Sequence, residues 1–334
     1  MIIVTGGAGF IGSNLVYKLN QIGIKDILIV DSLKNQLKQR NLNGLKFYDF
    51  IDKNDFIENL KKFKRIEIIF HQGACSNTME TDGIYMMKNN YEFSKIILNH
   101  CLNNKIRLIY ASSASVYGNG LNGFNEKEES EYPLNIYAFS KYLFDNYVRK
   151  FLEDKKYFYF KNTDYQTYEI YSGKKSNQLV GLRYFNVYGP QENHKKAMAS
   201  TVFHFYNQVK NEKKMKLFEG SENFIRDFIY VEDIIDINIF FFNNPQKSGI
   251  FNCGTSNPQS FLKIAQIIKD KFIDSEIEFI PFPDALIGKY QKYTSANIDK
   301  LRAAGFDNKF TSLHDGINKY LNYLEKNDGY LIKG

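Results

Sequence analysis

Short apolar runs alternate with longer amphipathic stretches along the first half of this 334-residue chain. The runs are continuous enough for strands buried on both faces of a sheet, and they lie at 2–5, 26–31, 66–71, 107–112, 179–184 and 250–253. Between them, helical patterns cover about 9–22 and 83–103. This alternation predicts an α/β fold with a Rossmann-type, doubly wound parallel sheet and right-handed crossovers.

The later part of the chain is less regular, and we expect it to form a smaller α/β substrate-binding lobe. It ends in an amphipathic helix with Leu313, Ile317, Tyr320, Leu321 and Leu324 on one side. The sequence predicts a dinucleotide-binding domain at 1–184 that the chain re-enters at about 227–256 and 290–302. The smaller lobe is then expected at 185–226, 257–289 and 303–334.

Segment 153–177 is polar and rich in tyrosine, and it lies between a predicted helix and a predicted strand. Connections of this length are usually insertions on the surface. Its five tyrosines also leave open a contact patch.

Composition narrows the class of protein. At 43% hydrophobic and 24% charged residues, the chain is globular, not disordered. It contains no apolar run of membrane-spanning length, so we expect no membrane segment. Three cysteines without close pairing and an opening without a basic leader predict a reduced, cytoplasmic protein with no disulfide framework and no metal site. The net charge of +7 comes from scattered lysines, which favours general basicity over a nucleic-acid surface.

A glycine motif follows the first predicted strand and opens the first predicted helix. It reads Gly7-Ala8-Gly9-Phe10-Ile11-Gly12, and Asp31 closes the second strand. Glycines let the backbone approach a pyrophosphate, which the helix N-terminus then binds. We therefore predict a dinucleotide site, with a ligand-free turn as the alternative. Asp31 favours NAD, and Lys38 or Lys53 could reverse that preference by folding over the ribose.

Tyr137 and Lys141 are four residues apart, so they share one face of a helix, and Ser113 follows the predicted strand at 107–112. About three Tyr-x-x-x-basic pairs arise by chance among 24 tyrosines and 44 basic residues, so only the context behind a dinucleotide motif gives this pair weight. Tyrosine can take a proton from an alcohol while nicotinamide takes the hydride. This requires the phenol pKa to fall from ~10 toward ~7, about 4 kcal/mol, in the field of Lys141 and the oxidised nicotinamide.

Four motifs resemble those of the extended short-chain dehydrogenase/reductase family: TGGAGFIG at 5–12, YASSASVYG at 110–118, YAFSK at 137–141 and RYFNVYGP at 183–190. Within it, the chain is more similar to the ADP-L-glycero-D-manno-heptose 6-epimerases. The motifs are HQGACSNT at 71–78, NHKKAMAS at 193–200, KLFEGSENF at 216–224, RDFIYVEDI at 226–234 and LRAAGF at 301–306. The resemblance covers nearly the whole chain apart from 153–177.

This resemblance implies an isomerase that inverts C6 of an ADP-heptose with bound NADP for lipopolysaccharide inner-core biosynthesis, and a homopentameric assembly. Tyr137 and Lys195 would be the acid/base pair, assisted by Ser113 and Lys141. The implied cofactor-binding residues are Gly6, Gly7, Gly9, Phe10, Ile11, Gly12, Asp31, Ser32, Lys38, Lys53, Gln72, Gly73, Ala74, Cys75, Ser76, Asn89, Lys141, Val187 and Lys195. The implied substrate-binding residues are Asn186, Ala197, His204, Phe218, Glu219, Gly220, Ser221, Arg226 and Tyr290.

Three departures from the family pattern stand out. Gln72 replaces a glutamate, Ala197 replaces a serine, and 153–177 is largely absent from the family. Of two adjacent lysines we choose Lys195, because it directly follows His194. Arg226, which could grip a diphosphate, could equally cover the core.

His204 could be a packed polar residue and not a substrate contact.

Alternative functions of the protein also remain at this point. A related 4-epimerase or a dehydratase is the second hypothesis, although Ser112 to Ser115 contain no carboxylate for dehydration. A non-catalytic dinucleotide sensor and a nucleic-acid binder are the remaining ones.

Overall fold

The computed structural model describes the chain except for residues 154–156, 161–167, 172–176, 284–290 and 333–334. Its centre is a seven-stranded sheet in the order β13-β8-β5-β4-β1-β2-β3, in which every pairing is parallel. The strands are β1 (Ile2–Thr5), β2 (Ile27–Asp31), β3 (Asp49–Asp52), β4 (Ile68–His71), β5 (Arg107–Ser113), β8 (Leu179–Tyr184) and β13 (Gly249–Cys253). The predicted Rossmann-type sheet is confirmed.

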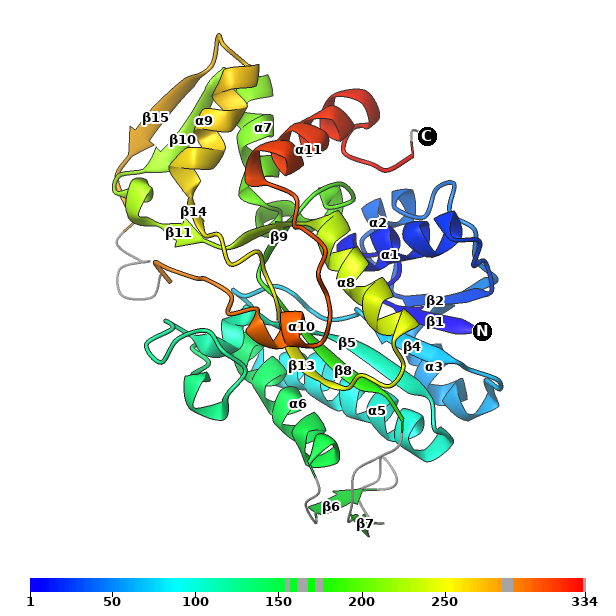
Figure 1. Ribbon diagram of the computed structural model, residues 1–334. Helices are drawn as coiled ribbons and strands as arrows, with labels where there is room; N and C mark the ends of the chain where they lie inside the picture. Colours follow the sequence, from blue (N-terminus) through cyan, green and yellow to red (C-terminus); the bar gives the residue numbers. More distant parts are fainter. Residues whose placement is uncertain (154–156, 161–167, 172–176, 284–290, 333–334) are drawn as a thin grey trace.

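Helices cover both faces of this sheet (Figure 1). The helices α1 (Phe10–Gln21) and α8 (Val231–Asn243) lie on one face, and α3 (Lys53–Asn59), α5 (Phe93–Asn104) and α6 (Ile136–Leu152) lie on the other. Successive residues of β1 divide between the two cores: Val4 packs with α1, and Ile3 packs with α5. This is the two-residue period of a strand, and it explains why the central strands are apolar throughout.

The expected helix at 83–103 is interrupted. It consists of α4 (Gly83–Met86), a π-helical turn (Met87–Glu92) and α5, and Phe93 N–H donates to the Lys88 carbonyl five residues back. π-Turns insert one residue into a helix and often occur at functional sites. Apolar periodicity does not reveal such an insertion, because the chain stays helical on both sides and the added residue changes the pattern only locally.

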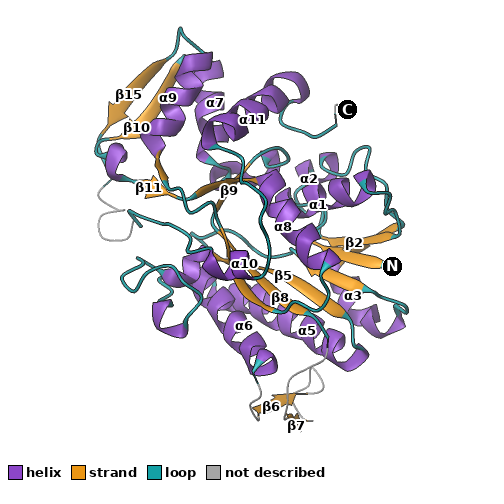
Figure 2. Ribbon diagram, viewed as in Figure 1, coloured by secondary structure: helices purple, strands orange, loops and turns teal. Residues whose placement is uncertain are grey.

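A second group of elements lies beyond the carboxyl ends of the central strands, where Figure 2 shows short strands beside helices. It includes the parallel pair β10 (Lys214–Phe218) and β15 (Glu276–Ile280) and the antiparallel pair β11 (Ile225–Arg226) and β14 (Gln259–Ser260). The parallel pair β9 (Asn186–Tyr188) and β12 (Phe228–Tyr230) lies next to them. The helices here are α7 (Thr201–Glu212), α9 (Phe261–Lys271) and α11 (Leu313–Asn327). The division into two domains stays a prediction.

The described chain also contains other short elements. They are α2 (Leu37–Arg40), α10 (Asp299–Ala303), and β6 (Tyr157–Phe160) paired antiparallel with β7 (Tyr168–Tyr171). The last two lie within the expected insertion, most of which is outside the described residues. None of the described helices combines the length and apolar character needed to cross a bilayer.

A buried ionic cluster joins α6 to β5 and β8. The Arg183 guanidinium donates to Asp145 at 2.8 Å through Nε and pairs with Glu131, and all three side chains are fully buried. Asp145 also accepts hydrogen bonds from the Tyr110 and Ser112 hydroxyls, each at 2.9 Å. Removing one partner from such a cluster leaves an uncompensated buried charge.

Replacing Arg183 with Met therefore leaves the buried Asp145 without its cation, whereas Glu131 keeps its ion pair with Arg149. We expect Arg183→Met to lower the free energy of unfolding by about 3 kcal/mol or more, measured by urea denaturation. The matched control is Lys319→Met, which removes the half-exposed Lys319–Glu232 pair and should cost less than about 1 kcal/mol. Equal losses in the two variants would contradict this account.

Candidate active site

The predicted cofactor residues gather at the carboxyl ends of β1, β2 and β4. Gly6 has a φ of +68°, and a Cβ there would lie 2.6 Å from the Gly73 backbone. A Cβ on Gly12 would overlap the Gly6 carbonyl oxygen. Glycine is therefore required at both positions for the turn to pack against β4 and α1.

The start of α1 has the features of an anion-binding helix terminus. Its N-cap, Gly9, offers no side chain, and its first turn contains no acidic residue. Within the described part of the chain, the N–H groups of Phe10 and Ile11 have no hydrogen-bond partner. Open N–H groups beside a glycine turn fit the pyrophosphate of a dinucleotide. Ser32, whose N–H donates to Asp31 at 2.7 Å, follows the second strand on the same edge.

Asp31 is already bound within the protein. It accepts a hydrogen bond from Ala8 N–H at 2.9 Å, and it forms an ion pair with Lys38 Nζ at 2.7 Å. Lys53 lies nearby and donates to Asn89 Oδ1. Burial lowers the pKa of Lys53, and the positive charges of Lys34 and Lys38 lower it further, against opposing contributions from Asp52 and Asp31. The edge of β2 thus carries a concentration of lysines around one neutralised carboxylate.

The loop 72–76 is held mainly by Asn90, which the sequence analysis did not select. Asn90 is 1% exposed, and its side-chain amide pairs with the N–H and the carbonyl of Cys75 at 2.8 and 3.0 Å. It also donates to Ser140 Oγ at 3.2 Å, next to Lys141. Ala74 is half-buried and Ser76 is exposed on the same loop. No spacing rule points to Asn90, because the π-turn sets its orientation.

Gln72 departs from the family pattern, and its side chain is engaged within the protein. Its Oε1 accepts from the Tyr184 hydroxyl at 2.9 Å, and its Nε2 donates to Asn238 at 3.2 Å. The side chain therefore contributes to a buried network with β8 and α8. The Gln72 backbone N–H is engaged as well, because it donates to the Thr5 carbonyl at 3.0 Å.

Tyr137 and Lys141 lie on the first turns of α6, as the spacing predicts. The Tyr137 hydroxyl is hydrogen-bonded to Ser113 at the end of β5. Lys141 is 5% exposed, and its Nζ donates to the Ala111 carbonyl at 2.8 Å. Ser113 Oγ also accepts from the Ser115 hydroxyl at 2.9 Å. The structure brings this triad together.

The electrostatics differ from the expected lowering of the phenol pKa. Burial raises the pKa of Tyr137, the nearby Cys75 thiol adds to this effect, and the hydrogen bond with Ser113 opposes it. Burial lowers the pKa of Lys141 to about 8, partly offset by Asp145 and Cys75. Both groups are thus shifted toward neutrality by desolvation, and activation of the phenol requires an additional positive charge in the site.

Lys195 approaches from a different segment, the 3₁₀ turn Asn193–Met198. Its Nζ lies 4.9 Å from the centre of the Phe10 ring and 3.8 Å from Glu192 Oε2. Burial lowers its pKa, and Glu192 opposes this. Glu192, another residue that the sequence analysis missed, is fully buried and also accepts from Ser200 N–H at 2.7 Å. Lys195 therefore lies beside the start of α1, and its proposed pairing with Tyr137 stays a prediction.

The predicted substrate residues follow one another around β9, α7, β10 and β11. Asn186 and Val187 pair with β12, and His204 on α7 contacts the Ala197 carbonyl at 3.3 Å. Phe218 ends β10, and Glu219 and Gly220, with φ of +80°, follow it. Tyr290 lies outside the described residues.

Two buried polar groups in this region suit a ligand. Ser221 is 2% exposed, and its hydroxyl has no hydrogen-bond partner among the residues that the structure describes. Arg226 is 5% exposed, donates to the Ile225 carbonyl at 3.0 Å and lies 5.8 Å above the Phe261 ring. An unpaired buried hydroxyl is costly unless a ligand or water satisfies it.

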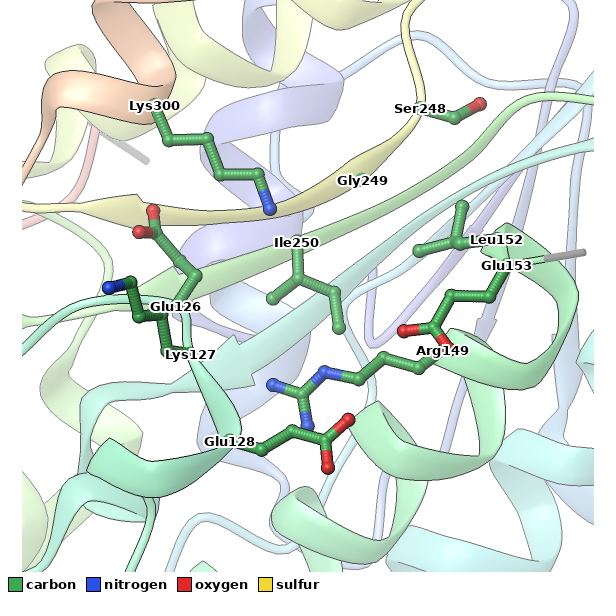
Figure 3. Close-up of a pocket in the computed structure, with 10 residues that line it drawn as sticks. All are labelled: Glu126, Lys127, Glu128, Arg149, Leu152, Glu153, Ser248, Gly249, Ile250 and Lys300. Carbon is green, nitrogen blue, oxygen red and sulfur yellow. The ribbon is translucent and has the colours of Figure 1, made fainter.

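A cavity of about 400 Å³ lies elsewhere, at the amino end of β13 and the last turns of α6 (Figure 3). Its lining residues are Glu126, Lys127, Glu128, Arg149, Leu152, Glu153, Ser248, Gly249, Ile250 and Lys300. None of the predicted site residues lines it, and Tyr137 lies at the opposite end of α6. Within the described ranges, no cluster of His, Cys, Asp and Glu residues could hold a metal ion.

Comparison with known proteins agrees with this geometry. The NAD dependent epimerase/dehydratase family matches residues 2–254. An ADP-L-glycero-D-manno-heptose-6-epimerase of Brachyspira hyodysenteriae is 59% identical over 336 residues, covering 99% of this chain and 100% of the relative.

Solved structures give the same result. The crystal structure of the Helicobacter pylori ADP-L-glycero-D-manno-heptose-6-epimerase has 33% identity and a TM-score of 0.81, covering 97% of this chain and 96% of that one. The Thermotoga maritima UDP-glucose 4-epimerase with UDP-glucose has 25% identity and a TM-score of 0.77, covering 97% and 98%. The chain therefore belongs to the NAD dependent epimerase/dehydratase family.

Proposed function

We propose that the protein interconverts ADP-D-glycero-β-D-manno-heptose and ADP-L-glycero-β-D-manno-heptose, a step that supplies heptose for the lipopolysaccharide inner core. The observation that carries this proposal is the 59% identity with the Brachyspira hyodysenteriae 6-epimerase over almost the whole chain. The protein is thus an isomerase of nucleotide sugars.

Inversion of an unactivated secondary alcohol requires a temporary carbonyl at C6. A bound NADP would supply this chemistry by reversible hydride transfer at C6. Tyr137 and Lys195 act as the two acid/base groups, one taking the hydroxyl proton and the other returning a proton after the ketone has turned. Ser113 orients the C6 oxygen by a hydrogen bond, as it already does with the Tyr137 hydroxyl.

Burial prepares these groups for proton transfer. Tyr137 stays protonated in the protein alone because burial raises its pKa. Burial lowers the pKa of Lys195, against the opposing charge of Glu192, and so favours its neutral amine more than in an exposed lysine. The phenol is therefore the group that carries its proton and the amine is the group whose neutral base form burial favours, and a positive charge beside the phenol would lower its pKa toward the base form.

The lysines at the end of β2 favour NADP over NAD. Asp31 normally repels a 2′-phosphate, but the ion pair with Lys38 cancels its charge. Lys53 then adds a second cation, whose pKa is lowered by burial and further by neighbouring positive charge. An incoming phosphate would relieve that repulsion.

The remaining parts of the proposal concern the substrate lobe and the assembly. Arg226 and Ser221 would contact the nucleotide sugar, together with Asn186, His204 and the segment after Phe218. We further propose a cytoplasmic homo-oligomer, with a pentamer as the expected state. Sedimentation of the purified protein measures that number directly.

The test of the activity uses purified protein and ADP-D-glycero-D-manno-heptose, with the configuration at C6 followed by NMR. We expect both epimers to appear with no net change in NADP(H). Tyr137→Phe and Lys195→Met should each lower turnover by ~10²-fold or more. The double variant should be little worse than either single one, because the two groups act as one unit.

Two neighbouring residues provide matched controls for these variants. Tyr132→Phe alters an exposed tyrosine, and Lys196→Met alters the exposed lysine next to Lys195. Both should retain normal turnover. Full activity in Lys195→Met would rule out the two-base mechanism, and absence of epimerisation by cofactor-loaded protein would rule out the function.

The cofactor preference is tested by Lys38→Gln and Lys53→Gln. Each removes one cation from the β2 edge, so each should weaken NADPH binding at least about tenfold and leave NADH binding nearly unchanged. Isothermal titration with both nucleotides measures the ratio, and the exposed Lys46→Gln is the control. Equal losses for the two nucleotides would refute recognition of a 2′-phosphate.

A further inference from the structure

A closed ring of hydrogen bonds begins and ends on the loop that follows β4. Gly73 N–H donates to Thr5 Oγ1 at 3.2 Å, and Thr5 Oγ1 lies 2.6 Å from His71 Nδ1. On its other side, His71 Nε2 lies 2.8 Å from Ser94 Oγ, which donates to the Asn90 carbonyl. The Asn90 side chain returns to the N–H and carbonyl of Cys75.

The ring is shielded from water. Thr5, His71, Ser94 and Asn90 are each at most 2% exposed. Thr5 and His71 are register partners at the ends of neighbouring strands, whereas Ser94 lies on α5 and Asn90 lies in the π-turn. Each group's hydrogen-bonding capacity must therefore be met by other protein groups and not by bulk water.

The hydrogens available to each group fix which group donates and which accepts in each hydrogen bond of the ring. The Ser94 hydroxyl gives its hydrogen to the Asn90 carbonyl, so it can only accept from His71, and His71 Nε2 must carry a hydrogen. Thr5 accepts from Gly73, and its own hydrogen points to His71 Nδ1. His71 is then neutral, with its hydrogen on Nε2. Burial and the charge of Lys141 lower the pKa of His71 to about 3, in agreement with a neutral imidazole.

Both ends of the ring attach to backbone atoms that adjoin the glycine turn. The Gly73 backbone is the one that a Cβ on Gly6 would meet, so the position of Gly73 sets the space beneath the turn. A shift of Gly73 would be transmitted to Gly6 and to the start of α1 through this contact. The mechanism proposed above gives His71 no role.

We propose that His71 is a positioning residue for the dinucleotide site, and that its neutral Nε2-protonated form orders the 73–75 loop through Thr5 on one side and Ser94 and Asn90 on the other. This rests on the part of the proposed function that puts a dinucleotide against Gly6 and Gly73. It is independent of which sugar nucleotide is the substrate.

The first test reads the tautomer in the wild-type protein. Long-range ¹⁵N–¹H correlation spectra of ¹⁵N-histidine-labelled protein separate the two neutral forms and the imidazolium. The His71 signal is assigned as the one that remains when each of the other four histidines is replaced in turn. We expect the Nε2–H form at neutral pH, and an Nδ1–H form or an imidazolium would overturn the proposal even if the His71 and Thr5 variants failed to fold.

The second test measures NADPH affinity by isothermal titration of cofactor-free protein. His71→Phe keeps the ring size but removes both nitrogens, and Thr5→Val keeps the shape but removes the hydroxyl. Each should weaken binding about tenfold or more, and His71→Gln, which keeps a donor toward Ser94, should lose less. At saturating NADPH, turnover should remain within several-fold of wild type, which separates loop positioning from a catalytic role.

The exposed His314→Gln is the control and should bind NADPH normally. Unchanged affinity in both His71→Phe and Thr5→Val would overturn the proposal. The protein could also lose NADPH affinity as expected in these variants and yet epimerise no ADP-heptose. That result would support the proposal for His71 and would count only against the proposed substrate. Normal epimerisation of ADP-heptose with unchanged NADPH affinities would overturn the proposal for His71 and support the proposed substrate.

Discussion

The close contact between two backbone segments is the constraint on which this site depends. Gly6 and Gly73 lie so near to each other that neither can carry a side chain without displacing the other segment. The contact joins the turn after β1 to the loop after β4, and it lets α1 begin directly beneath the sheet edge. A pyrophosphate can reach the N–H groups of Phe10 and Ile11 because no Cβ intervenes. The predicted cofactor residues at the carboxyl ends of the strands lie around this contact.

Burial sets the chemical character of the groups around this contact. It shifts the pKa of Tyr137 upward and the pKa of Lys141 downward, so both tend toward neutral forms. A few residues further along α6, Asp145 is paired with Arg183 in a fully buried cluster, which anchors the helix and offsets part of the shift at Lys141. The helix thus combines an ionic anchor near its middle with a reactive first turn whose charge depends on what binds.

Local patterns were sufficient to predict six of the seven strands of the sheet and the central triad. The edge strand β3 was not predicted, because it is short, half-exposed and begins and ends with aspartate, so it has no continuous apolar run. Apolar runs marked the strands from Ile2–Thr5 onward, and a four-residue spacing placed Tyr137 and Lys141 on one helix face. The residues that hold the site together were not predictable in this way. Asn90 acts through a π-turn, and Arg183 meets Glu131 across 52 residues of sequence. Such contacts depend on the folded topology, and neither periodicity nor motif spacing encodes them.

Dependence on folded contacts also explains why Asp31 in the sequence does not by itself decide between NAD and NADP. An acidic residue at the end of the second strand predicts NAD, because its charge opposes a 2′-phosphate. That rule assumes a free carboxylate, whereas here Lys38 binds one oxygen and Ala8 N–H binds the other. The carboxylate then serves to hold Lys38 and the glycine turn together. Cofactor preference follows the net charge around the ribose, and at this edge the lysines outnumber the single acid that the motif rule considers.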